Sequence, residues 1–244
     1  LIQPMANVEN YLDNRLSAED IRAMDYRHVI LATGARWRDS GVGVTNWQAI
    51  PGADQDQVIT AEDIFAGREV NGPVVVFDDD NYYMGALIAE QLRHVGHEVT
   101  LLTPAAQVSS WTEHTLEQHR IQAHVLELGI EVVTSRNITR IASDSVETAC
   151  VYTDRAGTLP AATVVLVTSR QPNDELLLEL NADADRLTDA GIRSVNAIGD
   201  CLCPSTIAAA VHDGHRVARE MDAPPANPDM PFRREIISLE DFES

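Results

Sequence analysis

The chain has 244 residues, of which 44% are hydrophobic and 23% charged, a composition typical of a globular protein with one large domain or two modest ones. Acidic residues outnumber basic ones by 38 to 18, and the formal charge of -20 argues against binding to nucleic acid or anionic lipid, because both require Lys or Arg at phosphates. The three cysteines form no disulfide or metal motif and no apolar run approaches ~20 residues, so we expect a cytoplasmic protein without a metal site or membrane span.

The N-terminal part of the chain predicts one strand and a long connection. Residues 1–4, LIQP, include no initiator Met and no targeting signal, so we expect the sequence to begin within a longer protein. The run HVILATGA at 28–35 predicts a buried parallel strand that enters a tight turn at Gly34. The stretch 36–71 is rich in Gly and Pro and predicts connecting structure with one short helix near 61–66. This stretch is a candidate crossover between domains.

From residue 73 the pattern changes to alternating strands and helices. A strand at 74–77, a helix with Met84, Ile88, Leu92 and Val95 on one face, and a strand at 98–103 predict a βαβ unit. We then expect a helix at 112–128, a strand at 130–134, an antiparallel excursion at 138–153 and a buried strand at 163–168. After a polar connection come a strand ending at 195–200 and a helix from about 205 to 221, capped by Ser205 or Thr206.

Three segments in this order carry a resemblance to a known family: ATGA at 32–35, the βαβ unit at 73–103 and AIGD at 197–200. Together they resemble the two-dinucleotide-domain flavoproteins related to disulfide reductases. The resemblance implies an α/β fold in which a Rossmann-like three-layer domain of the NAD(P) type, at 72–168, is inserted in the second half of a FAD/ADP-type dinucleotide-binding domain. That partial domain would comprise 1–71 and 169–222, and the proline-rich residues 223–244 would form an extended tail.

Longer segments narrow the resemblance. The stretch from 74 to 103, the helix after Trp111 and the closing MPFRREIISL resemble the C-terminal region of the trimethylamine, dimethylamine and histamine dehydrogenases, which are related to 2,4-dienoyl-CoA reductase. This implies an N-terminal (β/α)₈ barrel with FMN and a [4Fe-4S] cluster, neither of which is present in this sequence. The barrel portion would be the main partner, an electron-transferring flavoprotein a second one, and the enzyme a homo-oligomer.

The turn after the strand at 74–77 decides whether the inserted domain binds NAD(P)H. A nicotinamide-binding domain has G-x-G-x-x-G here, whereas residues 78–85 read DDDNYYMG. Side chains block the close approach of a pyrophosphate, and each carboxylate repels it, at a cost on the order of 4 kcal/mol for charges 4 Å apart. We expect a degenerate turn at Asp78, Asp79, Asp80 and Gly85 without NAD(P)H; a cation that bridges the aspartates to phosphate is the alternative.

The first domain retains three candidate cofactor-binding residues, Thr33, Gly34 and Asp200. By the resemblance, Asp200 accepts a hydrogen bond from a ribityl hydroxyl of FAD. If ADP is bound in place of FAD, Asp200 is equally well explained as a local structural acid before a capped helix. Thr33 and Gly34 let the chain pass close to a nucleotide. The first glycine-rich phosphate turn of this domain is absent from the sequence, so we expect an incomplete ADP or FAD site.

These observations predict the dinucleotide-domain portion of a flavin-dependent, iron–sulfur amine dehydrogenase that passes electrons to an electron-transferring flavoprotein. The segment contains no catalytic residue that we can assign and is expected to be inactive alone. A portion of an NAD(P)H-dependent dienoyl-CoA reductase is one alternative. A non-catalytic interaction module derived from such an enzyme is another.

Overall fold

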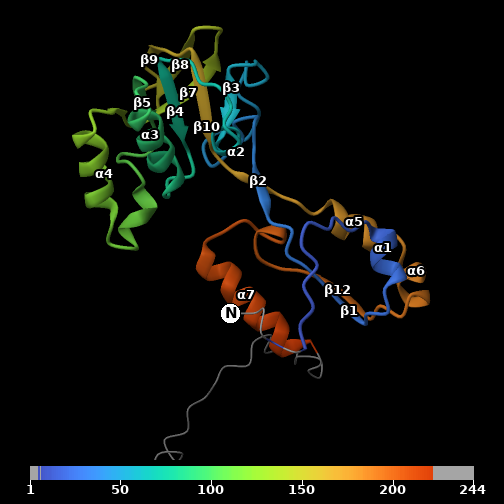
Figure 1. Ribbon diagram of the computed structural model, residues 1–244. Helices are drawn as coiled ribbons and strands as arrows, with labels where there is room; N and C mark the ends of the chain where they lie inside the picture. Colours follow the sequence, from blue (N-terminus) through green and yellow to red (C-terminus); the bar gives the residue numbers. More distant parts are fainter. Residues whose placement is uncertain (1–4, 6, 222–244) are drawn as a thin grey trace, which may run out of the picture. The chain divides into compact units, whose positions relative to one another are not determined.

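The computed structural model describes residue 5 and residues 7–221 (Figure 1), so the predicted tail at 223–244 lies outside the described residues. The contacts divide the chain into two compact units. One unit comprises residues up to Gly34 together with those from Pro172 onward, and the other is Ala35–Gln171. The chain therefore leaves the first unit once and returns to it once, and the second unit is an insertion.

A five-stranded, all-parallel sheet forms the centre of the inserted unit, in the order β3-β10-β4-β5-β6. Every residue of the two central strands, β4 and β10, is buried. Strands covered on both faces need apolar side chains at successive positions, which explains the runs of Val in the sequence. The strands are β3 (Val58–Thr60), β4 (Val74–Asp78), β5 (Val99–Leu102), β6 (Glu131–Val133) and β10 (Thr163–Val167).

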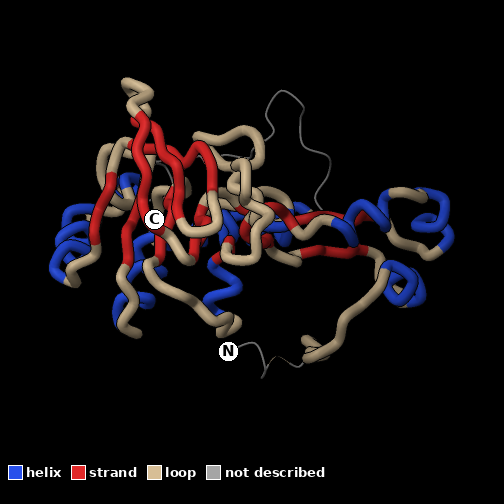
Figure 2. The backbone as a smooth tube through the Cα atoms, turned by 90° about the horizontal axis from the view of Figure 1, so that it is seen from above, coloured by secondary structure: helices blue, strands red, loops and turns tan. Residues whose placement is uncertain are grey.

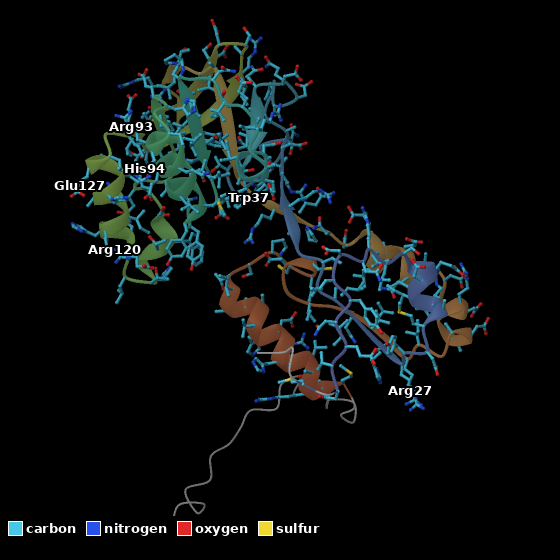
Figure 3. The ribbon with its side chains drawn as sticks, viewed as in Figure 1. Arg27, Trp37, Arg93, His94, Arg120 and Glu127 are labelled. Carbon is cyan, nitrogen blue, oxygen red and sulfur yellow. The ribbon has the colours of Figure 1, made fainter. Side chains whose placement is uncertain are left out.

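Helices cover one face of this sheet, with α3 next to β4 and β5 and α4 beside α3 (Figure 1). Ile88 and Leu92 of α3 pack in a buried cluster with Val74 and Val76, whereas Val95, predicted to share their face, is 69% exposed because it lies beyond the last helical turn. Arg93, labelled in Figure 3, donates from Nε to the carbonyl of Leu128 and so joins the ends of the two helices. The helical elements are α2 (Ala61–Phe65), α3 (Met84–His94), η1 (Ser110–Glu113) and α4 (Gln118–Glu127).

An antiparallel sheet covers the other face, in the order β7-β8-β9. Its Ile138 and Val146 pack in a second buried cluster with Val75 and Phe77, the β4 residues that alternate with those facing the helices. The predicted antiparallel excursion and three-layer arrangement are thereby confirmed, and Figure 2 shows the strands in red. These strands are β7 (Arg136–Ile141), β8 (Ser145–Cys150) and β9 (Ala156–Pro160).

Two predictions for this unit were wrong in detail. The single helix expected at 112–128 is divided into η1 and α4, because Leu116 adopts a left-handed φ of 61° that no α-helix accommodates. The connection expected at 36–71 contains strand β3, which pairs with β10 at the edge of the sheet. The inserted unit therefore includes residues assigned above to the first domain, while the nucleotide types of the two domains stay predictions.

The first unit contains a parallel pair, β1 and β12, in which Leu31 lies opposite Ala197. Ala18 of α1, Leu180 of α5 and Ile192, which precedes β12, lie in a buried cluster with Leu31 of β1. Thr206 caps α7 by accepting a hydrogen bond from the amide of Ala209, as predicted. The elements of the first unit are α1 (Ala18–Ala23), β1 (His28–Leu31), α5 (Glu175–Asn181), α6 (Ala184–Asp189), β12 (Ser194–Ala197), η2 (Gly199–Cys201) and α7 (Ile207–Glu220). Two short strands where the chain passes between the units, β2 (Ala35–Trp37) and β11 (Arg170–Pro172), pair with each other.

Taken together, these features confirm the predicted α/β fold class. Among the described helices, none has the length and apolar character needed to cross a membrane.

Candidate nucleotide sites

The inserted unit places its candidate site at the carboxyl ends of β4 and β10. These strands are neighbours, with β5 on one side of β4 and β10 on the other. In an open α/β sheet a ligand binds outside the carboxyl ends of the strands, where the strand order reverses in this way. Asp78 ends β4, and Val167 ends β10. The degenerate turn at 78–85 therefore lies where a dinucleotide would bind.

Asp78 is completely buried beneath the first turn of α3. Its Oδ1 accepts a hydrogen bond from the amide of Asn81 at 2.9 Å, and its Oδ2 has no hydrogen-bond partner among the described residues. A Cβ added at Gly85 would lie 2.4 Å from Cγ of Asp78. Gly85 thus retains one role of a glycine in the nucleotide fingerprint, close packing of helix on strand, while the Asp78 side chain occupies the space that this packing leaves.

The charge of Asp78 is strongly disfavoured by its surroundings. Its pKa is raised to about 7: burial is the largest cause, the backbone amides of Asn81 and Asp80 oppose the shift, and the neighbouring carboxyls of Asp80 and Asp79 add to it. A group that resists ionisation in this way is poorly solvated, and its few amide donors do not offset the loss of water. The same surroundings would not favour the two negative charges of a pyrophosphate.

Asp79 is also completely buried but is fully hydrogen-bonded. Its Oδ2 accepts from the amide of Thr45 at 2.8 Å, and its Oδ1 accepts from the hydroxyl of Thr45 at 2.7 Å. Burial raises its pKa, and these hydrogen bonds oppose the shift. Thr45 was not predicted as part of this site, because nothing in the sequence indicates a contact across 34 positions.

The remaining residues of the turn are also bonded within the chain. Asp80 is partly buried; burial raises its pKa, and Arg170 opposes the shift. Asn81 adopts a left-handed φ of 60°, accepts from the hydroxyl of Thr103 and, through its carbonyl, from the amide of Trp111. Among the described residues, no three His, Cys, Asp or Glu side chains form a group that could hold a metal ion.

The first unit places its candidate residues at one edge, where the parallel strands β1 and β12 end. The hydroxyl of Thr33 donates to the carbonyl of Asn173 at 2.6 Å and lies 3.0 Å from Sγ of Cys201, the neighbour of Asp200. Asp200 accepts from the amide of Ser205 at 3.0 Å. Gly34 has a left-handed φ of 74°, and a Cβ there would meet no atom within 4 Å. The structure thus brings Thr33 and the Asp200 segment together and leaves open space at Gly34.

One α/β unit inserted into another, each with parallel strands that end at a polar turn, defines the class of two-domain dinucleotide-fold oxidoreductases. The family described as pyridine nucleotide-disulphide oxidoreductase matches residues 6–214, and the chain belongs to that family.

Among curated proteins, the chain is similar to dimethylamine dehydrogenase from Hyphomicrobium sp. (strain x), at 34% identity over 90% of this chain and 33% of the relative. Among solved structures, histamine dehydrogenase from Rhizobium sp. 4-9 matches at 40% identity and a TM-score of 0.91, over 98% of this chain and 37% of the other. The 6-hydroxypseudooxynicotine amine oxidase of Pseudomonas geniculata N1 matches at 40% identity and a TM-score of 0.87, over 91% and 33%. The predicted resemblance to the dimethylamine and histamine dehydrogenases is confirmed. The chain spans about a third of the length of these relatives.

Proposed function

We propose that this chain is the dinucleotide-domain part of a flavin-dependent enzyme that oxidises an amine and passes the electrons to an electron-transferring flavoprotein. The support for amine oxidation is the similarity to two amine dehydrogenases and an amine oxidase. Because the chain spans about a third of each relative, we place FMN and a [4Fe-4S] cluster in the remainder of a longer protein. The barrel portion that holds them is the proposed partner of this chain, within a homo-oligomer.

The observation that carries the direction of electron flow is the burial of Asp78 and Asp79 at the carboxyl end of β4. A reductase of the dienoyl-CoA reductase type must bind NAD(P)H, and its pyrophosphate needs bare backbone at this turn. Here one carboxyl lies against Gly85, and the other is bonded to Thr45. A domain with this turn supports an outward route of electrons, which requires no nicotinamide.

In the first unit we propose Thr33, Gly34 and Asp200 as contacts to ADP or FAD. The open space at Gly34 and the partial exposure of Asp200 fit a ligand at this edge. Bound FAD would add a second redox-active flavin, whereas ADP would be a structural ligand only. No residue of this chain is proposed to act on the amine.

The test uses the full-length protein under anaerobic conditions. We expect a secondary amine, or an amine whose side chain carries an aromatic ring, to bleach the flavin absorbance. NADH and NADPH should not bleach it and should not bind in equilibrium dialysis. Micromolar NADH affinity together with flavin bleaching would instead establish the reductase alternative. If the purified full-length protein is colourless and stable, the interaction-module alternative replaces both.

A further inference from the structure

A segment of the inserted unit, Val42–Thr45, lies against the two strand ends that frame the candidate dinucleotide site. The hydroxyls of Thr168 and Ser169, which directly follow β10, donate to the carbonyl of Val42 at 3.0 Å and 2.6 Å. Asp79, which directly follows β4, accepts from the amide and the hydroxyl of Thr45. Four hydrogen bonds thus attach one short segment to both strands at the point where the strand order reverses.

The approach of this segment to the strand ends is close. A Cβ added at Gly43 would lie 2.5 Å from Oδ2 of Asp79 and 3.0 Å from Cβ of Thr168, so only a glycine leaves room for the backbone here. Asp79 and Thr168 are both buried, whereas Thr45 is exposed. The segment therefore forms the outer cover, and the two strand ends lie beneath it.

The contacts of Val42–Thr45 lie at the places where a bound dinucleotide would contact the domain. Its pyrophosphate approaches backbone closely at the end of the first strand, and its ribose lies in the crevice outside the neighbouring strand ends. In this chain a backbone segment makes the close approach and uses the polar groups of both strand ends. The hydrogen bonds are local to the crevice and do not depend on the charges of Asp78 or Asp80.

We propose that Val42–Thr45 is a covalently attached occupant of the dinucleotide crevice, so that the inserted domain is closed by its own chain as well as by its carboxylates. The inference rests on the proposed function, because it assigns a second, separable cause to the lack of NAD(P)H binding. It identifies Thr45, Thr168 and Ser169 as residues that exclude the dinucleotide.

The test uses the full-length protein and separates the effect of the segment Val42–Thr45 on NADH binding from the effect of the carboxylates. A turn variant, Asp78→Gly with Asp80→Gly, removes two carboxylates and keeps Asp79. A release variant, Thr45→Ala with Thr168→Val and Ser169→Ala, removes three of the donors and keeps all three carboxylates. A combined variant carries both sets. NADH is the probe in equilibrium dialysis, and hydrogen exchange of the amide of Thr45, compared with amides within β4, reports whether the segment stays in place.

We expect the Thr45 amide to be protected in the unaltered protein and to exchange at least about tenfold faster in the release variant, with β4 unchanged. NADH binding is expected in the combined variant and not in the turn variant. An unprotected Thr45 amide, equal NADH affinity of the turn and combined variants, or no affinity in the combined variant would each overturn the proposal. Each of these results leaves the proposed function standing, because within this experiment only NADH binding to the unaltered protein would contradict it.

Discussion

The two polar edges of the molecule differ in how their acidic groups are used. At the end of β4, Asp78 and Asp79 are both 0% exposed, and Asp79 is bonded to a segment of its own chain. At the end of β12, Asp200 stays partly exposed, and the neighbouring Gly34 borders open space. The same kind of edge is therefore filled by internal contacts in one unit and partly exposed in the other, because the core of each unit and its polar turn are made by different residues.

The largest expected effect concerns the buried carboxyl of Asp78. The folded state keeps its proton up to a pH of about 7, while the unfolded chain releases it near 3.8, so between these values the folded state binds more protons. The stability that this provides is complete below pH 4 and is lost as the pH rises to 7. Asp78→Asn should remove this dependence. In denaturant unfolding, the free energy of unfolding of the variant minus that of the unaltered protein should rise by about 2–4 kcal/mol from pH 4 to pH 7.5.

Asp63→Asn is the matched control for that measurement. Burial acts to raise the pKa of Asp63, but the amide and hydroxyl of Thr60 and the guanidinium of Arg68 together outweigh it, so the pKa is lowered. The carboxyl of Asp63 therefore stabilises the fold above pH 4. The difference in free energy of unfolding between Asp63→Asn and the unaltered protein should stay constant between pH 5 and 7.5. A constant difference for Asp78→Asn across the same range would show that the carboxyl is not held neutral in the fold.

Gly85→Ala should give the next largest effect. The added Cβ would lie within 2.6 Å of three atoms of Asp78, and overpacking of this kind destabilises a fold by about 1–3 kcal/mol. Gly214→Ala in α7 is the control, because its Cβ would come no nearer than 4.0 Å to Ile198, and alanine raises helix propensity. Thermal unfolding of both variants checks the pair; equal loss of stability would contradict tight packing at the β4 edge.

Asp200→Ala is expected to weaken nucleotide binding at the accessible edge. Loss of one hydrogen bond to a charged acceptor corresponds to about a tenfold decrease in affinity. The measurement is the content of tightly bound ADP or FAD in the purified full-length protein, determined after acid release. Asp80→Ala, at the closed edge, should leave that content unchanged. If Asp200→Ala retains the full content, the proposed role of this residue is wrong.

The smallest expected effect is that of Thr45→Val. It removes the hydroxyl that donates to Asp79 at 2.7 Å but leaves the amide bond at 2.8 Å, and should lower the free energy of unfolding by about 1 kcal/mol. Thr45→Ser keeps the hydroxyl and should restore most of the loss. Equal stability of the Val and Ser variants in urea unfolding would show that this hydrogen bond does not hold the segment.

Most elements of the inserted unit could be predicted because their sequences carry one strong periodicity. Examples are the apolar runs of β4, β5 and β10 and the helical spacing of Ile88 and Leu92. Strand β3 was missed, because a strand of three residues within a Gly- and Pro-rich stretch has too little pattern to be recognised. The division of the helix at Leu116 was missed as well, since no Gly or Pro marks that position.

The sequence by itself determined the class of fold, the family, and the replacement of the glycine-rich turn by Asp78, Asp79 and Asp80. Only the tertiary structure decided what these aspartates do: one packs against Gly85, and another holds Thr45. The physical reason is that burial and hydrogen-bond partners depend on which distant segments meet at a strand end, whereas periodicity and turn chemistry are local properties of the chain.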